Sequence, residues 1–249
     1  MISIITVNYN DSSRLKATVE SVIGQLNADY EFIVIDGASK DDSVNILNSY
    51  PDKINYWISE PDRGIFDAMN KGAAKASGEY CLFMNSGDIF ASKTILSEVA
   101  PLLDADIVCG NAQLTNGQNR VWVAPDVISD RFWRQRCSLC HQAVFIKTEI
   151  LKRNPYDASL KIVGDYKFLY YVTSILGCTY KHIDKIICQY GCDGISSNDA
   201  LSDSEKIKVI DEFVRMGYIR EDALVSKAKK MKVGSKRYVL ASLILSILS

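Results

Sequence analysis

Four short runs of apolar, mostly β-branched residues limit the fold of this chain more than any other feature. They cover Ile2–Val7, Tyr30–Ile35, Ile54–Ile58 and Tyr80–Met84, and segments with helical spacing separate them. Runs that are apolar at nearly every position predict strands buried on both faces, as in a parallel sheet. The sequence therefore predicts an α/β fold with helices on both faces of a mixed, mainly parallel sheet.

Helical signals fill the gaps between these strands. An apolar stripe from Leu15 to Leu26 follows a polar capping region, and a shorter stripe at 44–47 follows another. A third helix is expected from about Phe66 to Ala76, and it ends at Gly78. This order of strands and helices predicts a doubly wound, Rossmann-like, nucleotide-binding half over residues 1–100.

After residue 100 the pattern changes. Four elements are predicted there: strands over Asp106–Leu114, Arg120–Val123 and Tyr180–Tyr190, and a helix over Asp165–Leu176. The first two strands are joined by a Thr-Asn-Gly-Gln-Asn turn, which is typical of a hairpin. We expect one domain over 1–195, with a second half at 101–195, and a C-terminal helical appendage over 196–249.

Composition narrows the class of protein. With 249 residues, 47% of them hydrophobic, the chain can bury a full core. Its net charge of -1 and the lack of a zinc-finger or aromatic-basic signature argue against nucleic acid as a partner. An odd count of 7 cysteines, several inside apolar runs, indicates reduced thiols. Met1 leads directly into the first strand without a signal sequence, so a cytoplasmic location is expected.

Acidic side chains gather where the predicted strands end. Asp36 ends the second strand, Asp88 follows the fourth through an Asn-Ser-Gly-Asp turn, and Asp165 begins an apolar helix. Ligands of open α/β sheets bind at the carboxyl ends of the strands, where carboxylates can hold a ribose, a base or a hard cation. Each acid also suits a structural role as a turn or helix cap, and the pattern leaves both interpretations open.

The stretch between the third and fourth predicted strands begins a helix at Gly64. Its free N–H groups favour an anion, and Asp67, Asn70 and Lys71 follow within about one turn each. The alternative is that Asp62 and Asp67 only complement the helix dipole, worth about 0.3–1 kcal/mol each. Because Asn is a poor helix former in mid-helix, we favour a functional role for this stretch.

In order and spacing, residues 1–195 resemble a family 2 glycosyltransferase, most specifically from Ser59 to Asp88. The resemblance implies a GT-A-like fold and an inverting transfer from a nucleotide diphosphate sugar, with UDP favoured, to an acceptor hydroxyl of a growing surface glycan. Residues 101–195 would then form the acceptor side. The expected partners are the sugar nucleotide and a glycan carried on a polyprenyl diphosphate lipid.

The resemblance also assigns roles to single residues. Contacts to the donor are implied for Thr6, Asn8, Tyr9, Asp36, Asp62, Gly64, Asp67, Asn70, Lys71, Asn85, Ser86 and His141. Asp88 stands at the place of the family's Asp-x-Asp-type motif, which implies Mn2+ or Mg2+, and Asp165 at the place of its catalytic base. Asn85 and Gly87 stand where further acids often occur, so we expect weak metal binding without the nucleotide.

Three other classes of function remain as alternatives. A non-catalytic sugar or nucleotide binding module would bind UDP without turnover. A nucleotidyltransferase acting on a sugar phosphate predicts a glycine-rich, basic loop after the first strand, which Val7-Asn-Tyr-Asn10 lacks. A glycosidase using two carboxylates would need no nucleotide.

The C-terminal segment allows two interpretations. Six basic residues lie between Lys227 and Arg237, and an apolar run from Tyr238 to Ser249 follows them. This run is too short to span a bilayer, which takes about 20 residues, but it can lie in the interface of an anionic membrane. Attachment to the cytoplasmic face of the inner membrane would suit a lipid-linked acceptor. Packing of a last helix on the domain explains the same pattern.

Overall fold

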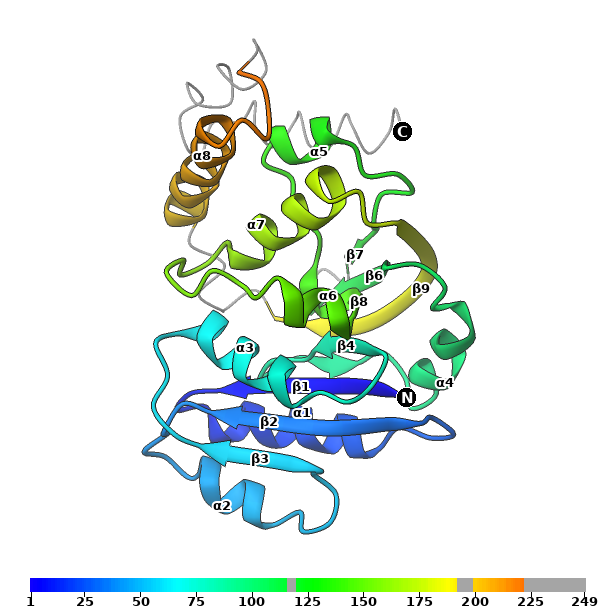
Figure 1. Ribbon diagram of the computed structural model, residues 1–249. Coiled ribbons are helices and arrows are strands. Elements are labelled where there is room, and N and C mark those ends of the chain that lie inside the picture. The colour runs from blue at the N-terminus through cyan, green and yellow to red at the C-terminus, as the bar shows by residue number, and fades with distance from the viewer. Residues whose placement is uncertain (116–119, 192–198, 222–249) are drawn as a thin grey trace.

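The structure, a computed structural model, describes residues 1–115, 120–191 and 199–221. Its strands are β1 (Ile2–Asn8), β2 (Tyr30–Asp36), β3 (Tyr56–Ser59), β4 (Tyr80–Phe83), β5 (Ile89–Phe90), β6 (Ile107–Leu114), β7 (Val121–Trp122), β8 (Val144–Lys147) and β9 (Tyr180–Tyr190). They form a 9-stranded sheet in the order β3-β2-β1-β4-β8-β6-β9-β5, with β7 paired to β6 (Figure 1).

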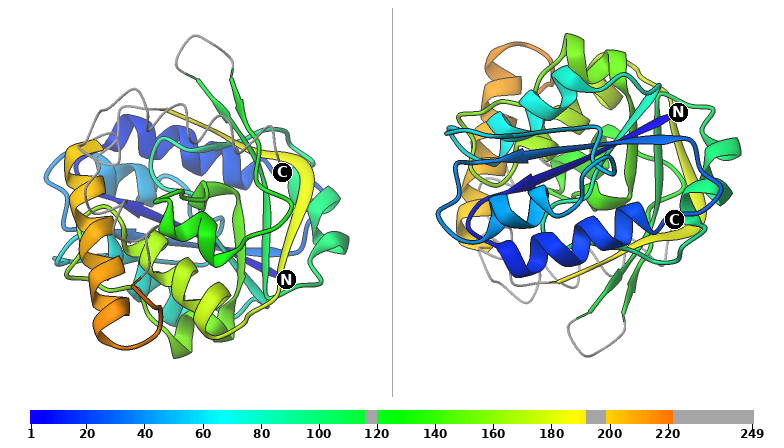
Figure 2. Two further views of the ribbon diagram at one scale, coloured as in Figure 1. Left: turned by 90° about the horizontal axis from the view of Figure 1, so that it is seen from above. Right: turned by 90° about the horizontal axis from the view of Figure 1, so that it is seen from below.

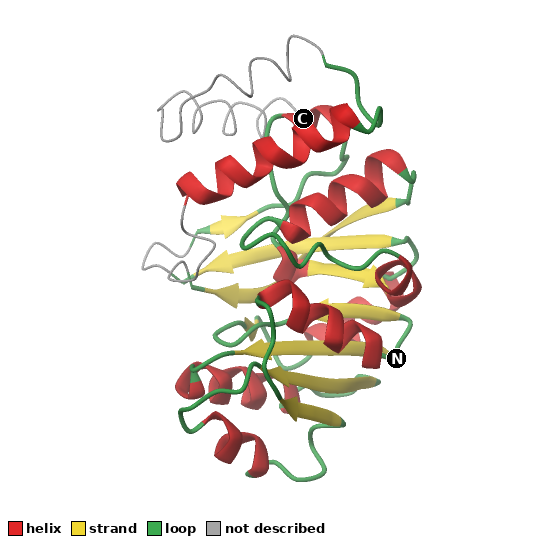
Figure 3. Ribbon diagram, turned by 60° about the vertical axis from the view of Figure 1, so that its left-hand side comes forward, coloured by secondary structure: helices red, strands yellow, loops and turns green. Residues whose placement is uncertain are grey.

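Helices cover both faces of this sheet (Figures 2 and 3). They are α1 (Ser12–Ile23), α2 (Ser43–Asn48), α3 (Ile65–Lys75), α4 (Ile95–Val99), α5 (Asp130–Arg134), α6 (Thr148–Arg153), α7 (Gly164–Tyr170) and α8 (Asp199–Arg215). Three short turns complete the set: η1 (Ala100–Leu102), η2 (His141–Ala143) and η3 (Tyr171–Ile175). One core cluster contains side chains of α1, α2 and α4, and the other contains side chains of α3 and α5 to α8.

The parallel half of the sheet agrees with the sequence prediction. β1 pairs in parallel with both β2 and β4, and β2 pairs in parallel with β3. In β2, Ile33 and Ile35 pack in one core cluster, and Phe32 and Val34 pack in the other. Both faces are therefore buried, which is why the predicted strands are apolar at nearly every position.

The second half makes the sheet mixed. β8 lies antiparallel between β4 and β6, and β9 runs parallel to β6. The predicted hairpin is confirmed, because β7 pairs antiparallel with β6. The predicted helix over Asp165–Leu176 is also confirmed: α7 continues into the π-helical turn η3, and Gly177 follows with a φ of 72° that favours glycine.

Several short elements were not predicted. β5, α4, α5 and α6 contain between 2 and 6 residues each, which is too few for a hydrophobic period to be recognised. These elements all come after β4, where the regular alternation of long strands and helices ends.

The predicted appendage starts as part of the main body. α8 contributes Val209, Ile210 and Phe213 to the core cluster that also contains α3 and α7. The predicted basic and apolar C-terminal segment, residues 227–249, lies outside the described residues, as does Cys192. Within the described residues, no helix has the length and apolar character needed to cross a membrane.

Candidate active site at the carboxyl edge of the sheet

The carboxyl ends of β1, β2, β3 and β4 lie along one edge of the sheet, on the left in Figure 1. The order of these strands reverses direction at β1, since β2 lies on one side of it and β4 on the other. In open α/β sheets, ligands bind at such a switch point, outside the carboxyl ends of the strands. Most of the predicted site residues follow these strands, so the topology brings them to the same edge.

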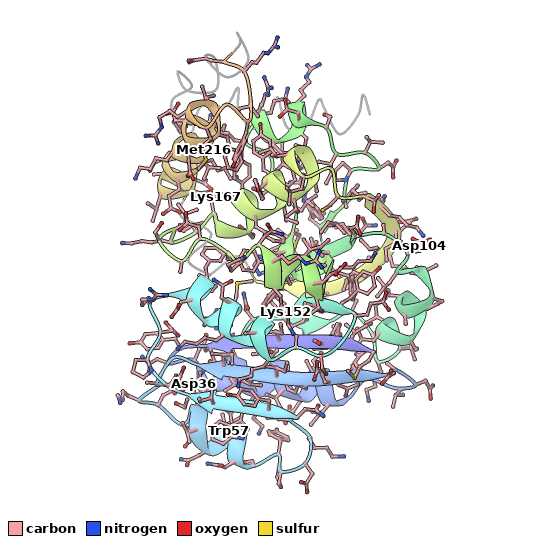
Figure 4. All side chains as sticks on the ribbon, in the orientation of Figure 1. Asp36, Trp57, Asp104, Lys152, Lys167 and Met216 are labelled. Carbon is pink, nitrogen blue, oxygen red and sulfur yellow. The ribbon has the colours of Figure 1, made fainter. Side chains whose placement is uncertain are left out.

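Asp36, labelled at the end of β2 in Figure 4, is the centre of a hydrogen-bond network. Its side chain is fully buried, and its carboxylate accepts hydrogen bonds from Asn8 Nδ2 at 2.7 Å and from Ser59 Oγ at 2.5 Å. The backbone N–H and the hydroxyl of Ser39 also donate to it, at 2.9 and 2.5 Å. Asp36 therefore joins the ends of β1, β2 and β3, and none of its surface is open to solvent.

Asn8 extends this network to the loop after β4. Its Oδ1 accepts a hydrogen bond from Ser86 Oγ at 2.8 Å, and its Nδ2 also donates to Ser43 Oγ at 2.9 Å. Thr6 is buried and donates to the Met84 carbonyl at 2.6 Å, so it ties β1 to β4. Because Thr6 has no exposed surface, a bound nucleoside could contact it only if the side chains that cover it moved.

Tyr9 and Asp62 form an open part of the edge. Tyr9 is 68% exposed, and an added Cβ on Gly37 would lie 3.2 Å from Cδ2 of its ring. The same Cβ would lie only 2.5 Å from Asp62 Oδ2, so a larger residue at position 37 would displace the Asp62 carboxylate. An exposed aromatic ring beside a carboxylate can stack on a base and accept hydrogen bonds from it or from a ribose.

The start of α3 carries two more of the predicted residues. Gly64 has a φ of 122°, which favours glycine, and its N–H donates to Asp62 Oδ1 at 2.9 Å. Asp67 accepts a hydrogen bond from the Arg63 guanidinium at 2.7 Å, which lowers the pKa of this carboxyl. The first turn of α3 is thus built around acidic side chains, as its sequence predicts.

Asn70 and Lys71 are already engaged within the protein. Asn70 Nδ2 donates to the Tyr156 carbonyl at 2.8 Å, and the Tyr156 N–H donates to Asn70 Oδ1 at 2.9 Å. Lys71 Nζ donates to the Pro61 carbonyl at 2.8 Å and pairs with Glu60 at 2.8 Å. In this state Asn70 joins α3 to the chain after α6, rather than facing the edge of the sheet.

Asp88 closes a tight turn after β4. Its Oδ2 accepts a hydrogen bond from the Asn85 N–H at 3.0 Å, and its Oδ1 accepts one from Gln142 Nε2 at 3.3 Å. Burial raises the pKa of Asp88 to about 6, although the charge of His141 and these two hydrogen bonds act to lower it. This carboxyl is therefore in an environment that favours its protonated form more than water does.

His141 lies between the two predicted catalytic and metal-binding acids. Its Nδ1 is 3.4 Å from Asp165 Oδ2, and its Nε2 is 3.1 Å from Asn85 Nδ2. Burial acts to lower the pKa of His141, but the hydrogen bond with Asp165 and the charges of Asp165 and Asp88 raise it to about 9. The two carboxylates, one from α7 and one from the β4 turn, thus favour the charged imidazole, while the Asn85 Nδ2 group that faces Nε2 suits a ring that accepts a hydrogen bond there.

Asp165 is held in place by the glycine before it. An added Cβ on Gly164 would lie 2.7 Å from the ring of Phe66, so only glycine lets α7 approach α3 this closely. Oδ1 of Asp165 accepts a hydrogen bond from the N–H of Tyr166 at 2.8 Å, which leaves Oδ2 toward His141. In this Gly-Asp pair, Gly164 is needed for the packing of α7 against α3, and Asp165 supplies the carboxylate beside His141.

The oxygen ligands of the β4 turn fit a hard divalent cation. Within the described part of the chain, Asn85 Oδ1 is buried and accepts no hydrogen bond. Together with the Asp88 carboxylate it provides two oxygen ligands, the type that Mg2+ and Mn2+ prefer. No cluster of three or more His, Cys, Asp or Glu side chains suited to a metal occurs in residues 1–115, 120–191 and 199–221. Most ligands of a bound cation would therefore have to come from a substrate and water.

Three residues at this edge were not singled out from the sequence. Ser39 and Ser59 complete the partners of Asp36, and Gln142 contacts Asp88. Ser59 is the last residue of β3 and Ser39 lies in the loop after β2, where serine is common, so the sequence gives little signal for either. Gln142 is the residue after His141.

Comparisons with known proteins agree with this fold. The sequence model of the family described as Glycosyl transferase family 2 matches residues 3–157. An uncharacterized glycosyltransferase of Mycobacterium tuberculosis strain H37Rv is 30% identical over 223 residues, which cover 87% of this chain and 82% of that protein.

Two solved structures have the same fold. S. aureus TarS 1-349 in complex with UDP-GlcNAc aligns with a TM-score of 0.70 and 20% identity, over 91% of this chain and 69% of that one. The chain spans only 41% of the longer TarS structure. The mannosyltransferase PcManGT from Pyrobaculum calidifontis, in complex with GDP-Man and Mn2+, aligns with a TM-score of 0.65 and 13% identity, over 99% of this chain and 80% of that one.

Proposed function

The chain belongs to glycosyltransferase family 2 and has the GT-A-like fold that its sequence predicts, and we propose that it is an inverting transferase that uses a nucleotide diphosphate sugar, with UDP as the nucleotide. One observation carries this proposal. Asp88 and Asp165, which are 77 residues apart by number, both interact with His141 at the carboxyl edge of the sheet. One edge of the sheet thus offers one acid for the donor's diphosphate and another for the acceptor.

The donor nucleotide is proposed to lie along the ends of β1, β2 and β3. The exposed ring of Tyr9 would stack on the base, and Asp62 would accept hydrogen bonds from the nucleoside. Asn8, Asp36 and Ser86 would hold this surface in place from behind. A direct contact of Asp36 with the base stays a prediction, because its oxygens are fully engaged by protein donors. The same holds for Thr6 and Asn70.

The diphosphate is proposed to lie near the first turn of α3 and the β4 turn. The N–H of Gly64 donates to Asp62, so the N–H groups of the residues that follow it at this helix start would favour an anion. Asp88 and Asn85 Oδ1 would hold Mn2+ or Mg2+, with Lys71 and Asp67 close to the phosphates. When bound, such a cation neutralises the charge that develops on the departing diphosphate.

Asp165 is proposed to act as the general base. Its Oδ2 would accept the proton of the acceptor hydroxyl while that oxygen attacks the anomeric carbon from the face opposite the diphosphate. This single displacement inverts the anomeric centre. General base catalysis is typically worth about 100- to 10,000-fold in rate, or roughly 3–5 kcal/mol of barrier. His141, whose Nδ1 is 3.4 Å away, orients this carboxylate.

We further infer that the acceptor is a surface glycan on a lipid carrier such as a polyprenyl diphosphate, and that the protein works at the cytoplasmic face of the membrane. The basic and then apolar composition of residues 227–249 supports this inference. Flotation of the protein with anionic liposomes, with and without residues 227–249, tests it. Equal flotation of the two forms would exclude membrane attachment by this segment.

A thermal-shift screen of UDP, GDP and dTDP sugars, with and without Mn2+, tests the donor proposal. A ligand at 100 times its Kd stabilises a protein by about 2.7 kcal/mol, which is roughly 5–11 °C in Tm for a domain of this size. We expect a UDP sugar to give the largest shift, and only with Mn2+. A protein that no sugar nucleotide stabilises would contradict the proposal.

Turnover separates the alternative functions. A binding module would show the shift in Tm but release no UDP in the presence of an acceptor. Hydrolysis of a plain glycoside without nucleotide would instead indicate a glycosidase, and release of pyrophosphate from a nucleoside triphosphate and a sugar phosphate would indicate a nucleotidyltransferase.

A further inference from the structure

A carboxylate from α8 holds the segment that leads into Asp165. The backbone N–H of Lys161 donates to Glu205 Oε1 at 3.0 Å, and the N–H groups of Ile162 and Val163 donate to Oε2 at 2.9 and 3.3 Å. Three consecutive amides thus converge on one side chain. The next two residues are Gly164 and Asp165.

Glu205 is well placed for this task because it cannot move away into solvent. It is 5% exposed, and it lies on the face of α8 that also buries Val209 and Phe213 in the core. An ionised carboxylate is costly to bury unless donors compensate its lost hydration, and here backbone amides do so. The three hydrogen bonds make the position of the segment depend on α8.

A second contact fixes the same segment from the opposite side. Gly164 lies directly against the ring of Phe66 on α3, where even a methyl group would not fit. Between Glu205 and Phe66, the backbone that carries Asp165 has little freedom. Its Oδ2 is thereby kept beside His141.

The neighbouring residue Lys206 supports this view of α8. It is 9% exposed, its Nζ donates to the Arg136 carbonyl at 3.0 Å, and it lies 5.4 Å from the centroid of the Tyr166 ring. Burial lowers the pKa of Lys206, while the charge of Asp165 acts to raise it. α8 therefore places two buried charged side chains near Asp165: Glu205 against the segment that precedes α7, and Lys206 against Tyr166.

We propose that Glu205 is a positioning residue that sets the location of Asp165 for proton transfer, through its hydrogen bonds to the amides of 161–163. This inference rests on the proposed function of Asp165 as the base. It assigns to α8, which lies after the residues that the family model matches, a role in the reaction rather than in the core alone. A shift of about 1 Å in a catalytic group can reduce the rate about 100-fold.

Glu205→Gln tests the proposal, and Glu212→Gln is its matched control. The first change puts an amide NH2 group against a backbone N–H. The second makes the same replacement on the same helix, where Glu212 accepts from Lys167 Nζ at 2.7 Å on the far part of α7. For Glu205→Gln we expect kcat to fall about 10- to 100-fold while KM for the sugar nucleotide and the affinity for UDP stay within about twofold. For Glu212→Gln we expect kcat to change by less than about twofold.

Glu205→Asp is a second variant that tests the same proposal, and it replaces the Gln variant if that protein does not fold. It keeps the charge and withdraws the carboxylate by one methylene, so we expect an intermediate loss of kcat, about 3- to 10-fold, with unchanged UDP affinity. If kcat of the Glu205 variants equals that of Glu212→Gln, or if UDP affinity falls in parallel with kcat, the positioning role is wrong. If the wild-type protein binds UDP but transfers no sugar, the proposed function fails, and this inference fails with it.

Discussion

Asp36 and Asp88 follow two strands of the same sheet edge, and both are almost completely buried, but their surroundings differ. Asp36 accepts hydrogen bonds from two serine hydroxyls, an asparagine amide and a backbone N–H, all within 2.9 Å. Asp88 accepts one from a backbone N–H at 3.0 Å and one from Gln142 at 3.3 Å, and its pKa is raised to about 6. The carboxylate of Asp36 is therefore fully hydrogen-bonded, whereas the carboxylate of Asp88 is not.

We propose that this difference separates a structural acid from a reactive one. A buried carboxylate with a full set of short hydrogen bonds fixes the groups around it and has little capacity left for a ligand. A buried carboxylate with few donors keeps its affinity for a proton or a cation. We therefore assign Asp36 chiefly to the framework of the site and Asp88, with His141 and Asp165, to its chemistry.

The largest loss of activity is expected on substitution of Asp165. If that loss were absent, the division into framework acids and reactive acids would be wrong. Asp165→Asn removes the proposed base while keeping the size of the side chain, so kcat should fall about 100- to 10,000-fold. The affinity for UDP, measured by calorimetry, should change little. Asp157→Asn is the control, because Asp157 pairs with Lys167 elsewhere in the same part of the chain. Equal turnover in both variants would remove Asp165 from the reaction.

A smaller effect is expected at Asp36, and it concerns stability. Asp36→Asn replaces one accepting oxygen by a donor inside a buried network, which should lower the free energy of unfolding by about 1–3 kcal/mol. Urea denaturation measures this loss, with the exposed Asp42 changed to Asn as the control. If instead the stability is unchanged and the affinity for UDP falls more than about tenfold, Asp36 contacts the nucleotide directly.

The smallest expected effect is the dependence of UDP affinity on pH. It tests whether Asp88, unlike Asp36, acts as a ligand of a cation. Its pKa of about 6 means that the carboxylate needed for a cation is lost as the pH falls through 6. Below that pH, affinity for UDP in the presence of Mn2+ should fall by up to about tenfold per pH unit. Titration of UDP binding between pH 5 and 8 measures this change. It should vanish without Mn2+ and in Asp88→Asn, and a pH-independent affinity in the wild type would speak against a metal at Asp88.

Ionisation of Asp88 should affect stability in the opposite direction to UDP affinity. As the pH falls through 6, affinity should decrease, but the contribution of Asp88 to the free energy of unfolding should increase. Because the pKa of Asp88 is higher in the folded protein than in an unfolded chain, its ionised form opposes folding above about pH 6. Acidification through 6 relieves this cost. A loss of nucleotide binding below pH 6 therefore does not require the protein to unfold.

The fold could be predicted well in the parallel half of the sheet, because there the residues of each strand indicate by themselves that both of its faces are buried. In β1, β2 and β4, burial on both faces demands an apolar residue at nearly every position, and this pattern is visible in the sequence. The strand ends then place Asp36 and Asp88 at one edge by topology alone. Asp165 was assigned a role only through the family resemblance. The structure places it beside His141 at the same edge of the sheet.

Contacts between distant segments could not be predicted. The two hydrogen bonds between Asn70 and the backbone of Tyr156 join residues 86 apart, and no local pattern marks them. Glu205 left a weak signal, because an acidic residue lines up with Val209 and Phe213 on the apolar stripe of α8. The partners that satisfy Asp36 were also hidden, since serines near turns are common in any loop.

The order of strands has a consequence for synthesis of the chain. β4 ends at Phe83, but its second neighbour in the sheet, β8, begins only at Val144. At roughly 5–20 residues per second, a ribosome needs about 3–12 seconds to make the intervening stretch. During that interval one edge of β4 has no partner strand, and its unpaired backbone N–H and C=O groups can pair with another chain.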